Sequence, residues 1–456
     1  MRITVGTQES KLITDNPDLF QALYELYSFK IPGAEYSTAY KRRHWDGKQH
    51  FISRAGKFKT GLLHRILEDL DKINCSPTLE FQSLGDAGTY ADPGIDGFTF
   101  YDYQEDLINK ALNSKRGVVK APTGAGKTLI MAGLVKALHG KKMVILFNQK
   151  QLLTQSYDFL VNDCGITNVG VCFGEGFEIN DIMLCTVQSI ERILDTHLDE
   201  AEVLMVDECH EFCNGKTTLA AINSFPNAQF RIGFTATPPS DKIPRYNLEG
   251  ALGPVWQKVD TASLVDSGTL TKPLIQLIRR PYDASGMDED MGFLDVYEQY
   301  IVNNDSRNNI IKEICDDIRS RQKSARILIL TKSLEHGRTL ENLLGEGCEF
   351  LEGANSIGER YQSISRFRSY RGSSILIGTK ILQTGVNIRE ITHFINARGM
   401  KSEIATLQAL GRALRTHESK DRVYVYDFLD QEKYLSDHSR ARKRHYENEG
   451  HEVKVL

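Results

Sequence analysis

Several features that would decide the class of a protein at once are scarce in this 456-residue chain. No apolar run approaches the roughly 20 residues that a membrane-spanning helix requires, and the first residues contain no apolar signal-peptide core. The eight cysteines are scattered without paired spacing, which fits a reducing compartment rather than a disulfide framework. These absences disfavour a membrane protein and a disulfide scaffold, and they predict a cytoplasmic protein.

The chain also has no large excess of charge of either sign. Its formal net charge of −4 argues against a uniformly basic nucleic-acid-binding protein, although the distribution of charge matters more than the sum. Between residues 30 and 65, nine lysines and arginines stand against two acids, with aromatic residues interleaved. Cations that neutralise phosphates, beside aromatic rings that stack on bases, are typical of a nucleic-acid surface.

Within this basic segment we expect Arg42, Arg43 and Lys48 to contact DNA phosphates. Trp45 is a further candidate for DNA binding, or else a core residue that positions the basic loop. The alternative interpretation of the segment is a small folded domain with solvated lysines and an aromatic core. We favour that alternative for Phe51 and Phe58.

The length of the chain predicts two or three domains. The first ninety residues alternate strand and helix patterns and predict an α+β module, residues 1–90, followed by a loop rich in glycine. From residue 118 onward apolar strands alternate with helices, and this pattern restarts near residue 326. We therefore expect an α/β fold in which two tandem, doubly wound parallel-sheet domains, residues 91–262 and 263–456, follow the module.

A phosphate-binding loop is the most informative motif. A short apolar run enters a glycine-bearing loop that ends in Gly-Lys-Thr and opens a helix; its candidate nucleotide-binding residues are Thr123, Gly124, Gly126, Lys127 and Thr128. Loop amides and the helix N-terminus attract phosphates, Lys127 reaches the β and γ oxygens, and the Thr128 hydroxyl can bind Mg²⁺. Because Ala121 replaces the first glycine of the usual pattern, a chance junction of loop and helix is the alternative.

Two adjacent acids, Asp207 and Glu208, follow a second apolar strand. Asp207 is placed to hold Mg²⁺, directly or through water, and Glu208 to orient and deprotonate the water that attacks the γ-phosphate. Such a pair alone is most often a solvated turn, but a P-loop about 80 residues upstream favours catalysis. A zinc site is the weaker alternative, because a fourth ligand is missing beside Cys209, His210 and Cys213.

Together with Thr235-Ala-Thr237 and the stretch from Gln408 to Arg415, these motifs resemble motifs I, II, III and VI of superfamily 2 helicases in order and spacing. The DECH sequence at residues 207–210, combined with the segment 40–48, more closely resembles the UvsW-type recombination helicases of tailed phages, which remodel branched DNA. The resemblance implies two RecA-like domains that use ATP and Mg²⁺ and couple hydrolysis to movement on nucleic acid.

The resemblance also assigns roles to single residues. Gln104 is similar to the glutamine that reads adenine in this superfamily, and Gln188 lies in a segment similar to one that grips a nucleic-acid strand. Thr379 and Gly385 lie in a stretch similar to motif V, which implies a DNA contact for Thr379 and a place in the nucleotide cleft for Gly385.

In the stretch that resembles motif VI, offsets of four and seven predict that Gln408, Arg412 and Arg415 share one helical face. Two guanidiniums on that face can stabilise charge on the γ-phosphate, as arginine fingers do. A basic surface helix is the alternative interpretation. We count all three residues among the candidate catalytic groups.

The chain is therefore predicted to be an ATP-driven, Mg²⁺-dependent DNA helicase or translocase that unwinds or branch-migrates forks and four-way junctions. An RNA helicase is the main alternative, because the catalytic motifs do not distinguish the sugar. A nucleic-acid-stimulated motor subunit of a larger complex is a third class. If the protein is phage-encoded, the expected cytoplasm is that of the infected bacterium.

Overall fold

The structure is a computed structural model that describes residues 1–456 except 83–89, 258, 281, 283–285, 287, 289, 353–354, 380–387 and 419. The side chains of residues 357, 403–405, 408 and 412 also lie outside this description. The chain divides into two compact units: Met1–Ala121 with Gly126–Lys258, and Pro122–Ala125 with Val259–Leu456. None of the helices in the described part of the chain is both long and apolar enough to cross a bilayer.

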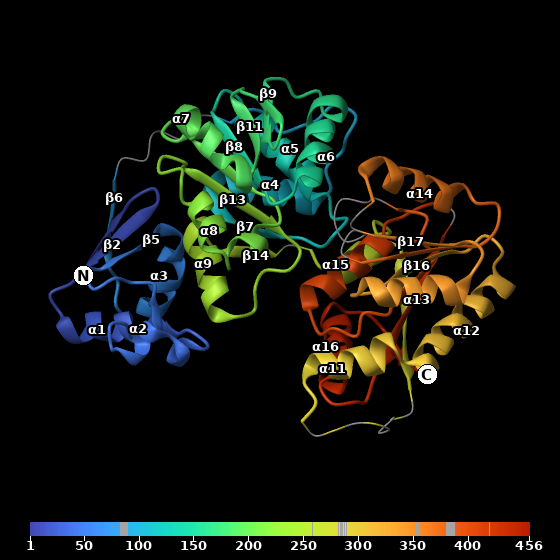
Figure 1. Ribbon diagram of the computed structural model, residues 1–456. Coiled ribbons are helices and arrows are strands. Elements are labelled where there is room, and N and C mark those ends of the chain that lie inside the picture. Colours follow the sequence, from blue (N-terminus) through green and yellow to red (C-terminus); the bar gives the residue numbers. More distant parts are fainter. Residues whose placement is uncertain are drawn as a thin grey trace. The chain divides into compact units, whose positions relative to one another are not determined.

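The first part of unit 1 is an α+β module (Figure 1). Its four-stranded sheet has the order β5-β2-β1-β6, with β1 and β6 parallel and the other neighbours antiparallel. Helix α1 begins at Pro17, because the Asn16 side chain accepts a hydrogen bond from the Leu19 amide and Pro17 occupies the first turn. The elements are β1 (Arg2–Val5), β2 (Glu9–Ile13), α1 (Pro17–Leu26), β3 (Ser28–Lys30), η1 (Ala34–Tyr36), α2 (Thr38–Lys41), β4 (Lys48–His50), β5 (Lys57–Lys59), η2 (Thr60–Leu62), α3 (Leu63–Asp71) and β6 (Thr78–Phe81).

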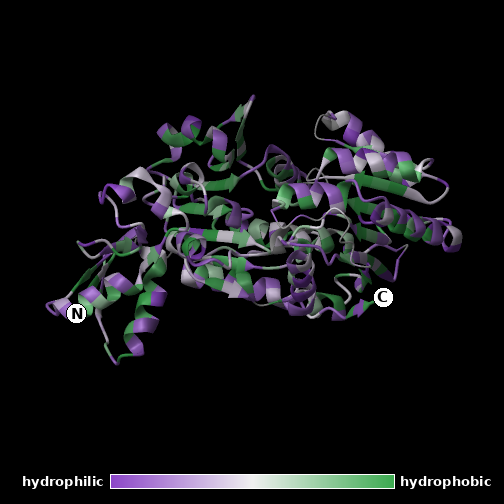
Figure 2. Cartoon of the chain, turned by 60° about the horizontal axis from the view of Figure 1, so that its bottom comes forward, coloured by the Kyte–Doolittle hydropathy of each residue, from purple (hydrophilic) through white to green (hydrophobic). Residues whose placement is uncertain are grey.

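An eight-stranded sheet follows in unit 1, in the order β10-β9-β11-β8-β12-β13-β7-β14, and only its β9–β10 pair is antiparallel. Strands β8, β11, β12 and β13 are buried along their whole length, which explains the apolar runs of β8, β11 and β12. Figure 2 shows strands coloured mainly as hydrophobic and helices that carry both colours, as expected for helices with one face on a sheet.

The helices and strands of this second part of unit 1 are α4 (Asp102–Ser114), β7 (Arg116–Lys120), α5 (Lys127–Ala137), β8 (Met143–Phe147), α6 (Lys150–Asp158), η3 (Phe159–Asp163), β9 (Val169–Phe173), β10 (Gly176–Glu178), β11 (Ile182–Thr186), η4 (Val187–Ile193), α7 (Leu194–His197), β12 (Val203–Val206), η5 (Cys209–Phe212), α8 (Lys216–Ile222), β13 (Phe230–Thr235), α9 (Lys242–Leu252) and β14 (Val255–Gln257).

Unit 2 contains a seven-stranded parallel sheet in the order β17-β18-β16-β19-β20-β15-β21. Its elements are α10 (Thr261–Asp266), β15 (Lys272–Arg279), α11 (Phe293–Tyr297), η6 (Glu298–Val302), α12 (Asp305–Arg321), β16 (Arg326–Leu330), α13 (Leu334–Leu344), β17 (Cys348–Leu351), α14 (Ile357–Ser369), β18 (Ser374–Gly378), β19 (His393–Asn396), α15 (Glu403–Ala413), β20 (Arg422–Leu429), α16 (Leu435–Asn448) and β21 (Val453–Val455). The expected α/β class, with two large parallel sheets, is confirmed; the domain boundaries at residues 90 and 262 stay a prediction.

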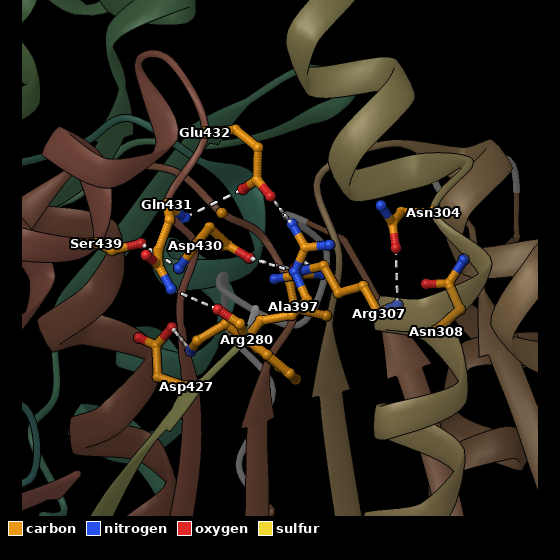
Figure 3. Close-up of polar contacts among 12 residues, drawn as sticks. Arg280, Asn304, Arg307, Asn308, Ala397, Asp427, Asp430, Gln431, Glu432 and Ser439 are labelled. Carbon is orange, nitrogen blue, oxygen red and sulfur yellow. Dashed lines mark hydrogen bonds and ion pairs between the residues drawn. The ribbon is translucent and has the colours of Figure 1, made fainter. Parts of the chain in front are cut away.

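A buried ionic cluster joins four elements of unit 2 (Figure 3). Arg307 of α12 donates from Nε to Asp430 Oδ1 at 3.0 Å, and Arg280, just after β15, donates to Glu432. Arg442 of α16 donates to Asp427 of β20 at 3.0 Å. All these side chains are at most 2% exposed, so each charge depends on its partners rather than on water. The cluster therefore fixes the ends of β15 and β20 against two helices.

Candidate active site and nucleic-acid surface

The order of the strands in unit 1 brings the predicted ATPase motifs together. Strand β13 lies between β7 and β12, and all three run parallel. The P-loop follows β7, the DECH sequence follows β12, and Thr235 and Thr237 lie at the end of β13. Because the carboxyl ends of parallel strands share one edge, three segments that are far apart in sequence meet there.

Glycine is required at two positions of the P-loop. Gly124 has φ +93° and Gly126 has φ +73°, in the left-handed region that other residues rarely adopt. Gly126 caps helix α5, which begins at Lys127 and presents its free amides to the loop. The Lys127 ammonium donates to the Ala121 carbonyl at 3.2 Å. The loop thus has the open backbone and the positive groups that a phosphate chain requires.

Gln104 lies against this loop. Its side chain is 2% exposed and accepts a hydrogen bond from the Tyr101 amide at 3.0 Å, which caps α4. A β-carbon at Gly126 would lie 2.4 Å from Gln104 Nε2, so the amide is in close approach to the start of α5. Tyr101 and Tyr103, the aromatic residues beside it, stack on each other with ring centroids 5.8 Å apart.

The two acids after β12 differ in their surroundings. Burial, and after it the charge of Glu208, raises the pKa of the Asp207 carboxyl to about 7, although the Lys127 ammonium opposes both. Glu208 has a left-handed backbone, φ 44° and ψ 48°, and its buried Oε2 has no hydrogen-bond partner in the described part of the chain. A buried carboxylate oxygen without a hydrogen-bond partner fits a site that a water or a hydrated cation completes.

His210 and the two threonines connect the DECH sequence with β13. His210 Nδ1 lies 2.8 Å from Thr235 Oγ1 and 3.4 Å from Glu208 Oε2, and Thr235 Oγ1 also accepts a hydrogen bond from the Thr237 amide. Burial lowers the pKa of His210, so the imidazole is neutral at neutral pH. The described residues contain no group of three or more His, Cys, Asp and Glu side chains arranged for a metal ion.

In unit 2 one sequence prediction is wrong. Helix α15 ends at Ala413, so Arg415 does not share its helical face with Gln408 and Arg412. Arg415 instead forms an antiparallel bridge with Leu270, and the Thr271 amide donates to the Leu414 carbonyl at 2.7 Å. This main-chain pairing replaces the helical hydrogen bonds. Burial lowers the pKa of the Arg415 guanidinium, and the side chains of Gln408 and Arg412 lie outside the described residues.

Two of the remaining predicted motor residues, Gln188 and Thr379, lie just after strands. Gln188 follows β11, is exposed and donates to the Asn148 carbonyl at 3.4 Å. Thr379 directly follows β18 and is half-buried, while Gly385 lies outside the described residues. The roles expected for these residues stay predictions.

The N-terminal module presents a basic surface. The side chains of Arg42, Arg43 and Lys48 are exposed, and none forms an ion pair with a residue that the structure describes. The half-buried Trp45 donates from its indole nitrogen to the Lys48 carbonyl at 2.9 Å, so it holds the loop in which these cations lie. The backbone of Arg43 is left-handed, with φ 58°.

A phosphate-binding loop and two acids at neighbouring ends of a parallel sheet, followed by a second parallel-sheet unit, define a P-loop nucleoside triphosphatase with two RecA-like domains. Residues 97–240 match the family described as type III restriction enzyme, res subunit, and residues 306–417 match the helicase conserved C-terminal domain. The chain is an ATP-hydrolysing nucleic-acid helicase of superfamily 2 that resembles UvsW.

Three relatives show this similarity. The chain is 23% identical over 439 residues to the ATP-dependent DNA helicase uvsW of Enterobacteria phage T4, covering 90% of this chain and 87% of that protein. The fold is shared with the type ISP restriction-modification enzyme LlaBIII bound to DNA, with a TM-score of 0.58 and 18% sequence identity. That match covers 79% of this chain and 31% of the LlaBIII chain. It is also shared with S. cerevisiae Dbp5 bound to RNA and ADP BeF3, with TM-score 0.55, 15% identity, 77% of this chain and 89% of that one.

Two polar residues near the site are not identified by the sequence motifs. Asn247 of α9 donates to the Cys213 carbonyl at 3.0 Å and accepts from Gln49 at 2.7 Å. Neither amide belongs to a motif, and nothing in its local sequence distinguishes it from a surface residue. Their contacts join segments that are far apart in the chain, so only the tertiary structure reveals them.

Proposed function

We propose that this helicase acts on DNA, and that it unwinds or branch-migrates branched substrates such as forks and four-way junctions. The observation that carries the proposal is the exposed basic surface of the N-terminal module, with three cations that no described carboxylate neutralises. A folded surface of this kind binds the phosphates of duplex DNA. The similarity to the DNA helicase UvsW, which extends over 90% of the chain, supports the same conclusion.

In the proposed mechanism Lys127 binds the β- and γ-phosphates of ATP, and Gln104 contacts the adenine beside the P-loop. Glu208 orients the attacking water and accepts its proton, for which its oxygen without a hydrogen-bond partner in the described residues is suited. Thr128 and Asp207 would hold Mg²⁺, which when bound neutralises charge on the phosphates. Arg412 and Arg415 stabilise the charge that develops on the γ-phosphate.

Measuring ATP turnover with a four-way DNA junction, a linear DNA duplex and single-stranded RNA, at equal nucleotide concentration, tests the proposal. The junction is expected to stimulate turnover most, and strand separation assays with the same junction should show ATP-dependent products. Stimulation by RNA equal to or above that by the junction would instead favour an RNA helicase. Equal stimulation by junction and linear duplex would remove the branched-DNA specificity.

A further inference from the structure

Helix α9 lies between the N-terminal module and the core of the ATPase domain, within unit 1. One face carries Leu248 and Leu252, which are buried in the core that also contains Cys209 of the DECH sequence. On another face the Tyr246 ring lies 4.8 Å from Phe29 and 5.3 Å from Phe51 of the module. The helix is therefore shared by both folded parts (Figure 1).

An ion cluster fixes the module on the same helix. Glu249 is 1% exposed and accepts hydrogen bonds from Arg65 of the module, at 2.9 Å to Nη2, and from Arg245 of α9. His64 Nε2 lies 3.4 Å from the same carboxylate. A β-carbon at Gly61 would lie 2.0 Å from the Glu249 carbonyl oxygen, which shows how closely the two backbones approach. The module thus packs directly on α9.

A hydrogen-bonded chain runs through α9 from the basic strand of the module toward the catalytic acids. Gln49 follows the exposed Lys48 in β4 and turns its own amide inward, donating to Asn247 Oδ1 at 2.7 Å. Asn247 Nδ2 donates to the Cys213 carbonyl at 3.0 Å. A side-chain amide can accept from one partner and donate to the other in this way, and both partners fix its orientation.

The path of hydrogen bonds continues inside the ATPase core. The buried Cys213 thiol donates to the His210 carbonyl at 2.7 Å. His210 in turn lies against Thr235 and the Glu208 carboxylate. A displacement of β4 therefore has a continuous path of short contacts to the residue that we expect to activate water.

We propose that Gln49 and Asn247 are positioning residues that couple the N-terminal module to ATP hydrolysis. When DNA binds the neighbouring cations, the position of Gln49 determines the position of the Asn247 amide. The Asn247 amide in turn determines, through Cys213, where the DECH segment lies. This coupling rests on the proposed function, because it takes the module as the DNA-binding part. It adds a route by which the bound substrate sets the rate of hydrolysis.

Three variants test the hydrogen bonds of this path one at a time and together. Gln49→Leu removes the first hydrogen bond and leaves the Asn247–Cys213 contact. Asn247→Asp keeps an acceptor for Gln49 but cannot donate to the Cys213 carbonyl. The double variant removes both. Gln21→Leu is the matched control, because this exposed glutamine of the same module donates to Glu25 of its own helix.

The readout is the ratio of DNA-stimulated to DNA-free kcat, with KM for ATP and the Kd for DNA measured alongside. Each single variant is expected to lower the ratio about fivefold or more, with KM changed by less than about twofold. The double variant should lose no more than the larger single loss, since both changes interrupt one chain. A ratio that stays at the wild-type value, or losses that multiply, would overturn the coupling.

The assay uses both a four-way junction and single-stranded DNA. If the wild-type enzyme shows no preference for the junction, the branched-DNA proposal fails on its own. The ratio is then taken with whichever DNA stimulates turnover, and a loss in Gln49→Leu still supports the coupling. A loss in the control variant as well would assign the effect to general destabilisation of the module and reject the specific chain.

Discussion

Glu208 combines a strained backbone with an unsatisfied side-chain oxygen. A residue other than glycine in the left-handed region costs about 1–3 kcal/mol when bulky, and such strain persists only where the surroundings impose it. Here the turn after β12 points the carboxylate toward His210 and leaves Oε2 buried without a hydrogen-bond partner in the described residues. These features are expected of a group whose partner arrives with the substrate.

Replacing this carboxylate by its isosteric amide tests that assignment. Glu208→Gln should bind ATP with nearly unchanged affinity but lose turnover by about 100-fold or more, because an amide cannot accept the proton of the attacking water. Equilibrium binding of labelled ATP and steady-state phosphate release measure the two effects. Lys127→Ala is the contrasting variant and should lose binding as well as turnover. Phosphate release near the wild-type rate in Glu208→Gln would remove the residue from catalysis.

Helix α9 depends on one buried charge at the junction with the module. Burial alone would raise the pKa of Glu249. The hydrogen bonds of His64, Arg65 and Arg245 outweigh burial and lower the pKa from the ordinary value of 4.5 to about 2. A lowered pKa in the folded state means that the carboxylate stabilises the fold fully above pH 4.5. That contribution disappears as the pH falls from 4.5 toward 2.

We therefore expect Glu249→Gln to lower the free energy of unfolding of unit 1 by about 3 kcal/mol at neutral pH, because Arg65 and Arg245 lose their partner. The difference from the wild type should shrink as the pH falls below 4.5. Urea unfolding followed by tryptophan fluorescence measures it, since both tryptophans, Trp45 and Trp256, lie in unit 1. Glu80→Gln, at an exposed ion pair, should change little. If the difference in the free energy of unfolding between Glu249→Gln and the wild type did not change with pH, the link to the lowered pKa of Glu249 would be rejected.

The ionic cluster of unit 2 predicts a similar effect at a different element. Arg307→Met should destabilise unit 2 by about 3–5 kcal/mol, since Asp430 would lose its nearest cation while remaining buried. Urea unfolding is followed by circular dichroism and by tryptophan fluorescence, which reports unit 1. The part of the circular dichroism transition that has no counterpart in the fluorescence belongs to unit 2, and it should move to a lower urea concentration. Arg321→Met, at an exposed pair with Asp317, is the matched control. Equal midpoints for Arg307→Met and this control would contradict a stabilising role for the cluster.

At the scale of the whole molecule, the nearly balanced net charge conceals a local surface for nucleic acid. Several cations elsewhere in the module are paired with carboxylates: Lys57 pairs with Glu9, Arg2 with Glu80 and Lys72 with Asp69. The proposed DNA-binding cations have no such partners in the described chain. Binding of phosphates at this surface would therefore release counterions.

Changing Arg42, Arg43 and Lys48 together to glutamine should reduce the slope of log Kd against log salt for a four-way junction by up to about 3. Fluorescence anisotropy at several salt concentrations gives the slope, and thermal unfolding verifies that the variant is folded. The control changes Arg2, Lys57 and Lys72 to glutamine, with the same loss of charge at paired residues. Equal slopes for the two triple variants would assign the basic segment to structure and strengthen the RNA-helicase alternative.

The sequence by itself determined the chemical class and the alternation of strands and helices. Phosphate binding requires glycine, lysine and threonine at a fixed spacing, so that spacing predicts Gly126, Lys127 and Thr128 as phosphate-binding residues. Continuous apolar runs such as residues 203–206 predicted strands buried on both faces. Local signals sufficed wherever function or burial restricts the residue types at neighbouring positions.

Only the tertiary structure decided what depends on contacts between distant segments. Arg415 lies beyond the end of α15, because its main-chain pairing with Leu270 competes with helical hydrogen bonds. No local sequence signal reports that competition. Glu249 and Arg307 look like surface residues until their partners, distant in the chain, bury them. Gln49 and Asn247 are ordinary amides whose contacts arise only when the module packs on α9. Their energies depend on burial and partner geometry, and the folded chain alone fixes both.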